Sequence, residues 1–169
     1  MPRITSGRRR GCATVGAVAR PFRSDRGWSF DVDVDRLWDR FTTVEQYVEW
    51  WPWLRSFDPA DGFRTGACWR CVVAPPLPYV VRFTVQLDRI DEGRRVDATV
   101  RGDVRGGAVL TVDGDGDGGS TARLRSELAP ANPVLRSVGR VARPMVEWGH
   151  DWVLDQGLRQ FVAAALHDA

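Results

Sequence analysis

The sequence has no run of apolar residues that approaches the roughly 18 residues needed to cross a membrane as a helix. This absence excludes stable insertion into a membrane. The chain of 169 residues is 43% apolar and 27% charged, which is ordinary for a soluble protein and sufficient for one domain with a sizeable core. Lysine is also absent, so all 24 basic residues are arginine, a bias to which we attach no chemistry.

Cysteine is scarce, with three residues in the chain, which favours a reducing, cytoplasmic compartment. Cys68 and Cys71 match the C-x-x-C spacing of redox pairs. The surrounding GACWRCVVA is typical of a strand, however, in which residues three apart point to opposite faces. A zinc site would need more ligands, and only Cys12, His150 and His167 remain. We therefore expect two ordinary strand cysteines, no metal and no cofactor.

Several catalytic motifs are missing as well, namely a nucleophile elbow, a phosphate-binding loop and a paired-histidine zinc motif. The acidic loop DGDGDGG (113–119) begins like a calcium loop. The twelfth position of such a loop needs a bidentate glutamate, and Leu124 stands there. We predict a hairpin turn at this loop.

Positive charge is concentrated at the start of the chain. Residues 1–26 contain seven arginines and one aspartate, about +6, whereas the rest contains 17 arginines and 21 acidic residues, about −4. No basic face recurs along the domain, which argues against nucleic-acid binding. We predict a disordered basic tail over 1–26 and one domain over 27–169. An export signal is disfavoured because the apolar part of the tail is short and built of small residues.

The order of elements predicts an α+β fold. WSFDVDV (28–34) alternates strictly between apolar and polar residues, as a half-buried strand does, and Asp35 is expected to cap two short helices that meet near Thr42 and Thr43. Pro133 and Pro144 each suit the start of a helix near the end of the chain, the second one long. Between the two helical regions we expect antiparallel strands joined by tight turns, near 54–58, 66–74, 79–90, 94–103, 107–113 and 120–128.

These elements suit a curved antiparallel sheet of about six to seven strands wrapped around the long C-terminal helix. Such a sheet cannot close tightly on the helix, so we expect a cavity between them. Gly149 and Gly157 in the helix would let a neighbour approach closely.

The stretch VEWWPWLRSF (48–57) has an unusual density of aromatic residues. Trp50, Trp51 and Trp53 could be core, a membrane-surface anchor or the wall of a cavity, and we favour the cavity. They cannot all face one way on a short helix that ends at Pro52, so one or two should be core and one could line an entrance. Large flat apolar side chains with an N–H group suit aromatic or ring-shaped ligands.

The chain resembles the START-like helix-grip superfamily, SRPBCC, in particular its bacterial polyketide cyclase/dehydrase-like and lipid-transport-like branch. The resemblance covers residues 28 to about 166 and implies a deep, largely apolar cavity for a lipid, sterol, polyketide or other aromatic compound. A minority of the superfamily are enzymes, and no shared catalytic motif can be transferred. The pieces that carry the resemblance, in order, are Phe30-Asp31-Val32 with Trp38, Glu49-Trp50-Trp51-Pro52-Trp53, Gly66 with Trp69, Pro75-Pro76-Leu77-Pro78-Tyr79, Gly102-Asp103 with Gly106, and Arg143-Pro144 with Trp148, His150-Asp151 and Gly157.

We therefore predict a protein that binds or transfers a small hydrophobic or aromatic molecule, lipid or polyketide-like. The alternative is an enzyme of the polyketide cyclase, aromatase or dehydratase kind, with Tyr79 and His150 as weak catalytic candidates. An interaction module with a collapsed cavity is a third possibility, and oligomeric state stays open. The residues expected to line the cavity are Trp51, Trp53, Trp69, Cys71, Tyr79, Val81, Phe83, Val85, Ala98, Val100, Leu110, Leu124, Ser126, Met145, Trp148 and Trp152.

Overall fold

The computed structural model describes residues 21–141 and 143–166, without the side chains of 138–141, 143, 145 and 146. The strands are β1 (Phe22–Phe30), β2 (Leu54–Asp58), β3 (Cys68–Val73), β4 (Val81–Asp91), β5 (Arg95–Gly102), β6 (Val104–Gly114) and β7 (Ser120–Pro130). The helices are α1 (Val34–Thr42), the 3-10 segment η1 (Val44–Gln46), α2 (Tyr47–Trp50), α3 (Pro133–Val141), α4 (Arg143–Phe161) and the π-helical segment η2 (Val162–Leu166).

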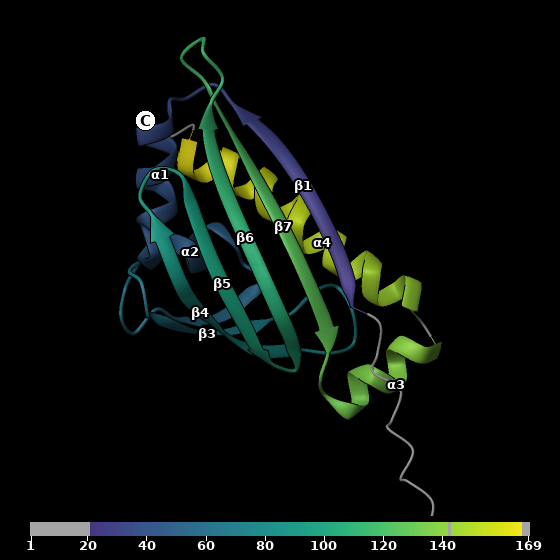
Figure 1. Ribbon diagram of the computed structural model, residues 1–169. Coiled ribbons are helices and arrows are strands. Elements are labelled where there is room, and N and C mark those ends of the chain that lie inside the picture. The colour runs from purple at the N-terminus through teal and green to yellow at the C-terminus, as the bar shows by residue number, and fades with distance from the viewer. Residues whose placement is uncertain (1–20, 142, 167–169) are drawn as a thin grey trace, which may run out of the picture.

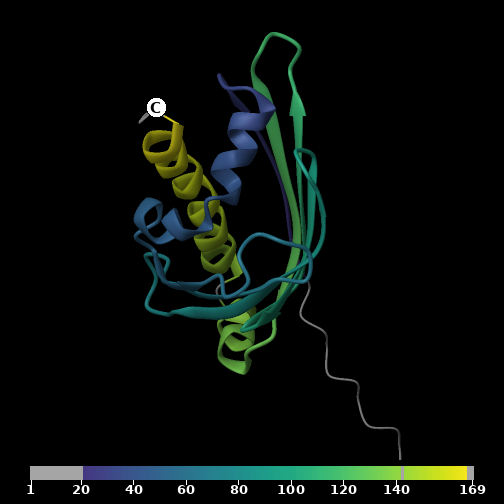
Figure 2. The same cartoon turned by 90° about the vertical axis from the view of Figure 1, so that its left-hand side faces the viewer.

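The seven strands form one antiparallel sheet in the order β1-β7-β6-β5-β4-β3-β2. Consecutive strands β2 to β7 are neighbours, and β1 closes the far edge by pairing with β7. The sheet is strongly curved, and α1, α2 and α4 lie on its concave side (Figures 1 and 2). This arrangement confirms the predicted helix-grip architecture.

The first strand begins earlier in the chain than the alternation of apolar and polar residues predicts. β1 runs over Phe22–Phe30, not over 28–34, so residues 22–26 belong to the sheet although they were assigned to the tail. The N-cap of α1 is Asp33, not Asp35, and its carboxylate accepts a hydrogen bond from the backbone N–H of Arg36 (2.8 Å). Residues 1–20, which make up the rest of the predicted tail, lie outside the described residues.

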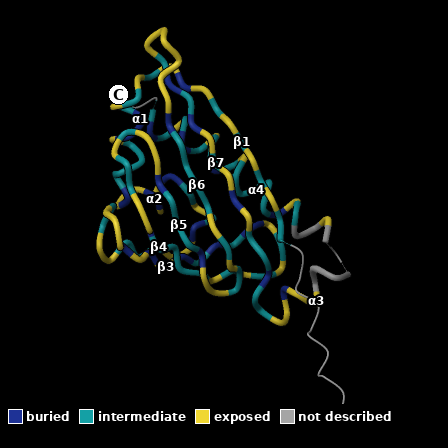
Figure 3. The backbone as a smooth tube through the Cα atoms, viewed as in Figure 1, coloured by how far each residue is buried: buried dark blue, intermediate teal, exposed yellow. Residues whose placement is uncertain are grey.

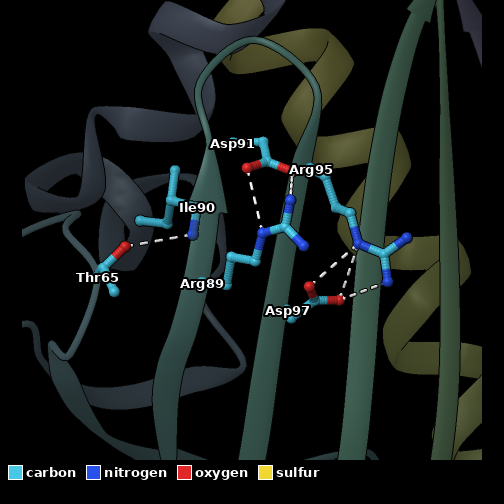
Figure 4. Close-up of polar contacts among 6 residues, drawn as sticks. All are labelled: Thr65, Arg89, Ile90, Asp91, Arg95 and Asp97. Carbon is cyan, nitrogen blue, oxygen red and sulfur yellow. Dashed lines mark hydrogen bonds and ion pairs between the residues drawn. The ribbon is translucent and has the colours of Figure 1, made fainter.

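Exposed residues alternate with half-buried and buried ones along β1, so its two faces differ in burial; Figure 3 shows the burial of each residue along the backbone. The outward residues form ion pairs, two of which are drawn in Figure 4, between Arg89 and Asp91 and between Arg95 and Asp97. On the outer face of β1, hydrogen bonds from Arg123 hold the pKa of the Asp25 carboxyl below its usual range. Part of the charge on this outer face is therefore paired.

The acidic loop is the hairpin turn between β6 and β7. The carboxylate of Asp115 accepts hydrogen bonds from the backbone N–H groups of Asp117 and Gly119, both at 2.9 Å. This side chain therefore organises the turn itself.

Cys68 and Cys71 point to opposite faces of β3, as predicted. Cys68 is exposed and Cys71 is buried, and burial raises the pKa of the Cys71 thiol to about 12. Because the thiolate is the reactive form, Cys71 is inert near neutral pH.

We expect iodoacetamide at pH 8 to modify Cys68 much faster than Cys71 in the native protein. Trypsin cleaves after Arg70 and so places the two cysteines in different peptides, which mass spectrometry can quantify separately. In the denatured protein both peptides should be labelled equally, which is the control. Equal labelling of the native protein would contradict the orientation of β3.

Candidate functional site

The aromatic stretch after α1 holds the C-terminal helix in place. The indole N–H of Trp51 donates a hydrogen bond to the backbone carbonyl of Gly157 (2.9 Å), and that of Trp53 donates to Oε1 of Gln160 (2.9 Å). The rings of Trp51 and Trp53 stack, with centroids 5.7 Å apart. We call this set of contacts between Trp51, Trp53 and α4 the tryptophan clamp.

Gly157 makes the clamp possible. A Cβ atom at this position would lie 3.2 Å from Cζ2 of Trp53 and 3.8 Å from Nε1 of Trp51, so a larger side chain would push the rings away. Trp50 is buried instead and packs edge-on against Phe161 at 5.5 Å. The aromatic stretch is thus partly core and partly a helix anchor, and Trp53 alone among the three tryptophans also borders a hollow.

A groove lies between α4 and the proline-rich linker that joins β3 to β4. Its volume is about 640 Å³, within the range of small-molecule sites. Seven of its 13 lining residues are aromatic or proline, and about half of its exposed wall is polar. We call it the helix groove; its lining residues are Pro52, Trp53, Arg55, Ala74, Pro75, Pro76, Leu77, Pro78, Tyr79, Val80, Trp152, Gln156 and Gln160.

A smaller hollow of about 150 Å³ lies inside the protein against the concave face of the sheet. Its wall is almost wholly apolar, and the one phenol in it, that of Tyr47, donates its hydrogen bond to the backbone carbonyl of Phe41. We call it the inner cavity; its lining residues are Phe41, Tyr47, Phe63, Trp69, Val85, Leu87, Val96, Ala98, Ala108, Leu110 and Leu124.

The position of the inner cavity corrects the prediction of one deep cavity between sheet and C-terminal helix. No residue of α4 lines the inner cavity, which is closed by α1, α2 and the loop that contains Phe63. The reason is that Phe161, near the end of α4, fills the space between sheet and helix by stacking on Phe41 at 5.1 Å and meeting Phe30 edge-on at 6.3 Å. The helix groove also borders α4, but none of the three phenylalanines of this contact lines it.

A third hollow of about 520 Å³ borders the sheet over β1, β7, β6, β5 and β4. Most of its lining side chains, such as Arg23, Asp97 and Glu127, point to the outer face. Ser24, Ala98, Ala108 and Ser126 border it too, but the hydroxyl oxygens of both serines are buried. We see no selective ligand site in this ion-paired surface.

The predicted lining residues divide between the two other hollows. Trp53, Tyr79 and Trp152 line the helix groove, and Trp69, Val85, Ala98, Leu110 and Leu124 line the inner cavity. Trp148 lines none of the three hollows, and half of its surface is exposed. The side chain of Met145 lies outside the described residues. The remaining predicted residues border neither the groove nor the inner cavity; they are Trp51, Cys71, Val81, Phe83, Val100 and Ser126.

The sequence analysis did not predict the part of the inner cavity's wall that comes from helices and loops. Phe41, Tyr47 and Phe63 close the inner cavity, although only tertiary packing brings them over the sheet. Leu77, in the proline-rich linker between β3 and β4, reaches α4 at Gly149, where a Cβ would lie 2.7 Å from its Cδ1. In the sequence, the proline-rich segment 75–78 and Gly149 were the features that could have indicated the helix groove.

The two weak catalytic candidates lie near each other in the chain fold but are not a pair. Tyr79 borders the groove, its hydroxyl 3.5 Å from where a Cβ of Gly149 would stand, and burial raises its pKa. His150 has a buried Nε2 with no hydrogen-bond partner among the described residues. Burial lowers the pKa of His150, an effect that Asp151 opposes and Arg26 reinforces.

We expect replacement of Trp51 by phenylalanine to lower the free energy of unfolding by about 1–2 kcal/mol, because the carbonyl of Gly157 loses its indole donor. Urea denaturation measures this change. Trp148→Phe is the matched control, since its half-exposed ring should change stability by less than about 0.5 kcal/mol. Equal stability of the two variants would show that the clamp contributes nothing.

No protein-family model matches the sequence, and no curated protein is similar to it in sequence. Solved structures are similar in fold. A START superfamily protein from Mycobacterium smegmatis has a TM-score of 0.67 at 11% identity, over 87% of this chain and 99% of that one. The Zhui aromatase/cyclase from Streptomyces sp. R1128 has a TM-score of 0.66 at 11% identity, over 88% and 93%.

Norcoclaurine synthase from Thalictrum flavum is similar at a TM-score of 0.63 and 10% identity, over 96% of both chains. Identities this low establish the fold alone. Among the described residues, no helix is long and apolar enough to span a membrane. The expected resemblance to the START-like helix-grip proteins is thus confirmed at the level of the fold.

Proposed function

We propose that the protein binds a small hydrophobic or aromatic molecule, and that the helix groove is where such a ligand is first held. The observation that carries this proposal is the wall of the groove. Trp53, Trp152 and Tyr79 are among the residues that line this hollow of about 640 Å³. Burial of apolar ligand surface against them contributes roughly 25 cal/mol per Å².

Polar groups are set at a few points of the groove, where they can orient a ligand. The Gln160 amide already accepts a hydrogen bond from Trp53, and that of Gln156 accepts one from Arg159. Arg55 and the Tyr79 hydroxyl complete the polar inventory of the groove. In small-molecule sites, polar groups at defined positions beside aromatic side chains fix the orientation of the ligand.

Proteins of the same fold support the aromatic part of the proposal. Norcoclaurine synthase from Thalictrum flavum has been solved in complex with dopamine and hydroxybenzaldehyde, both aromatic molecules. The groove and the inner cavity together argue against a module with a collapsed interior, since neither volume is negligible.

The enzyme alternative has less support from the residues at the groove. Cyclisation or dehydration of a polyketide needs several groups that move protons or stabilise an oxyanion. Of the residues that line the groove, only Arg55 and Tyr79 have titratable side chains. His150 does not line it, so the two candidates do not converge on one reacting atom.

We expect the neutral fluorescent probe N-phenyl-1-naphthylamine to bind saturably to the protein. Replacing Trp152 by alanine should weaken its binding about tenfold, a change of ~1.4 kcal/mol, because the probe loses a ring face. Trp148→Ala is the matched control, four residues away on the same helix and outside the groove. Absence of saturable binding to the unmodified protein, or equal loss in both variants, would contradict the proposal.

A further inference from the structure

Three buried polar atoms on one side of the interior have no hydrogen-bond partner among the described residues. They are Oγ of Ser24, Oγ of Ser126 and Nε2 of His150. Ser126 as a whole is only 9% exposed. Most buried polar groups in folded proteins are hydrogen-bonded, so a set of three unpaired ones requires an explanation. We call this set the polar edge.

The fold makes the two serines neighbours in the sheet and places His150 on the helix that contacts β1 through its next residue, Asp151. Ser24 on β1 and Ser126 on β7 are cross-strand partners and point to the same, concave face. Arg26, two residues along the same face of β1, forms an ion pair at 3.0 Å with Asp151, the chain neighbour of His150. The first half of α4 therefore lies over the strand pair that carries the two serines.

The polar edge adjoins the inner cavity. Ser126 is the cross-strand partner of Ala108 and stands two residues after Leu124 on the same face of β7, and both of these residues line the cavity. Directly opposed residues on a sheet face have Cβ atoms about 5 Å apart. Small side chains continue across the sheet in this row, from Ser24 through Ser126 and Ala108 to Ala98.

The size of the inner cavity limits what it can hold. At about 150 Å³ it matches the volume of engineered apolar cavities that bind benzene. We propose that the inner cavity binds a single aromatic ring that carries a hydroxyl group, and that Ser126 hydrogen-bonds this hydroxyl at the polar edge. This inference rests on the proposed function and names the class of molecule that the interior selects.

The charges near the polar edge favour a neutral ligand. Arg26 lies between Asp151 at 3.0 Å and Asp155 at 3.9 Å, so one positive and two negative groups give this region a net charge of −1. His150 is neutral at pH 7 because burial lowers its pKa. A carboxylate would meet repulsion there and would lose far more hydration free energy than the neutral hydroxyl of a phenol.

Isothermal titration calorimetry with phenol and toluene tests the inference, because the two molecules have similar shape and differ in the hydroxyl. We expect phenol to bind the full chain more tightly than toluene, and benzoate not to bind. In Ser126→Ala the affinity for phenol should fall about threefold to tenfold, the loss of one hydrogen bond, while that for toluene is unchanged or rises. Ser29→Ala, an outward serine on β1, is the matched control and should change neither affinity.

Two further measurements separate binding from folding. The melting temperature of Ser126→Ala should equal or exceed that of the unmodified protein, because the replaced hydroxyl has no partner to lose. Ala108→Leu should abolish binding of both small ligands, because the larger side chain fills the cavity. A lower melting temperature for Ser126→Ala, or binding that survives in Ala108→Leu, would overturn the inference.

The inference also fails if phenol binds no tighter than toluene, or if Ser126→Ala leaves the ratio of the two affinities unchanged. If neither molecule binds while N-phenyl-1-naphthylamine still saturates the helix groove, the inner subsite is wrong and the proposed function stands. If the naphthylamine probe also fails to bind, the proposed function falls with it.

Discussion

The tryptophan clamp is the contact on which both hollows depend. It fixes the second half of α4 by indole hydrogen bonds to Gly157 and Gln160. The same stretch of helix carries Trp152 and Gln156 into one wall of the helix groove, and Trp53 forms part of the opposite wall. The shape of the helix groove therefore depends on the contacts of the tryptophan clamp.

The end of α4 sets the limit of the inner cavity. Phe161 meets Phe30, Phe41 and Trp50, so three aromatic rings from β1, α1 and α2 converge on one ring of the helix. Such ring pairs are favourable beyond the area that they bury. This packing excludes a ligand from the end of the sheet–helix interface and leaves open space only beside it, where Phe41 becomes cavity wall.

The sequence predicted the fold well because period-two alternation is a local signal. It failed at β1 for the same reason. Val32 and Val34 continue the apolar alternation beyond Phe30, but Val34 begins α1 and packs beside Gly93 and Gly114, where added Cβ atoms would lie 3.9 and 3.7 Å from its methyl groups. Val34 has the spacing expected of a strand residue, but it is the first residue of α1.

Most of the lining residues that were predicted belong to strands or to the long helix, and Trp53 and Tyr79, which lie in loops, are the exceptions. Trp69, Val85 and Leu124 followed from the inward face of the sheet, and Trp152 from the helix wheel. Phe63 could not be predicted, because its loop reaches the cavity through contacts with Trp38 and Trp69 that no local pattern encodes. Whether an aromatic residue holds α4 in place or lines a hollow depends on where Gly149 and Gly157 let other segments come close to the helix.

The interior shows packing that stability alone does not explain. A row of small residues, Ser24, Ser126, Ala108 and Ala98, crosses the concave face where larger apolar side chains would fill space, and two of its members line the inner cavity. Cavities and unpaired buried polar groups both lower the free energy of unfolding. Natural sequences retain such losses mainly at functional sites. The coincidence of an unfilled volume with unpaired hydroxyls at its margin is what a ligand with an apolar body and one polar group would compensate.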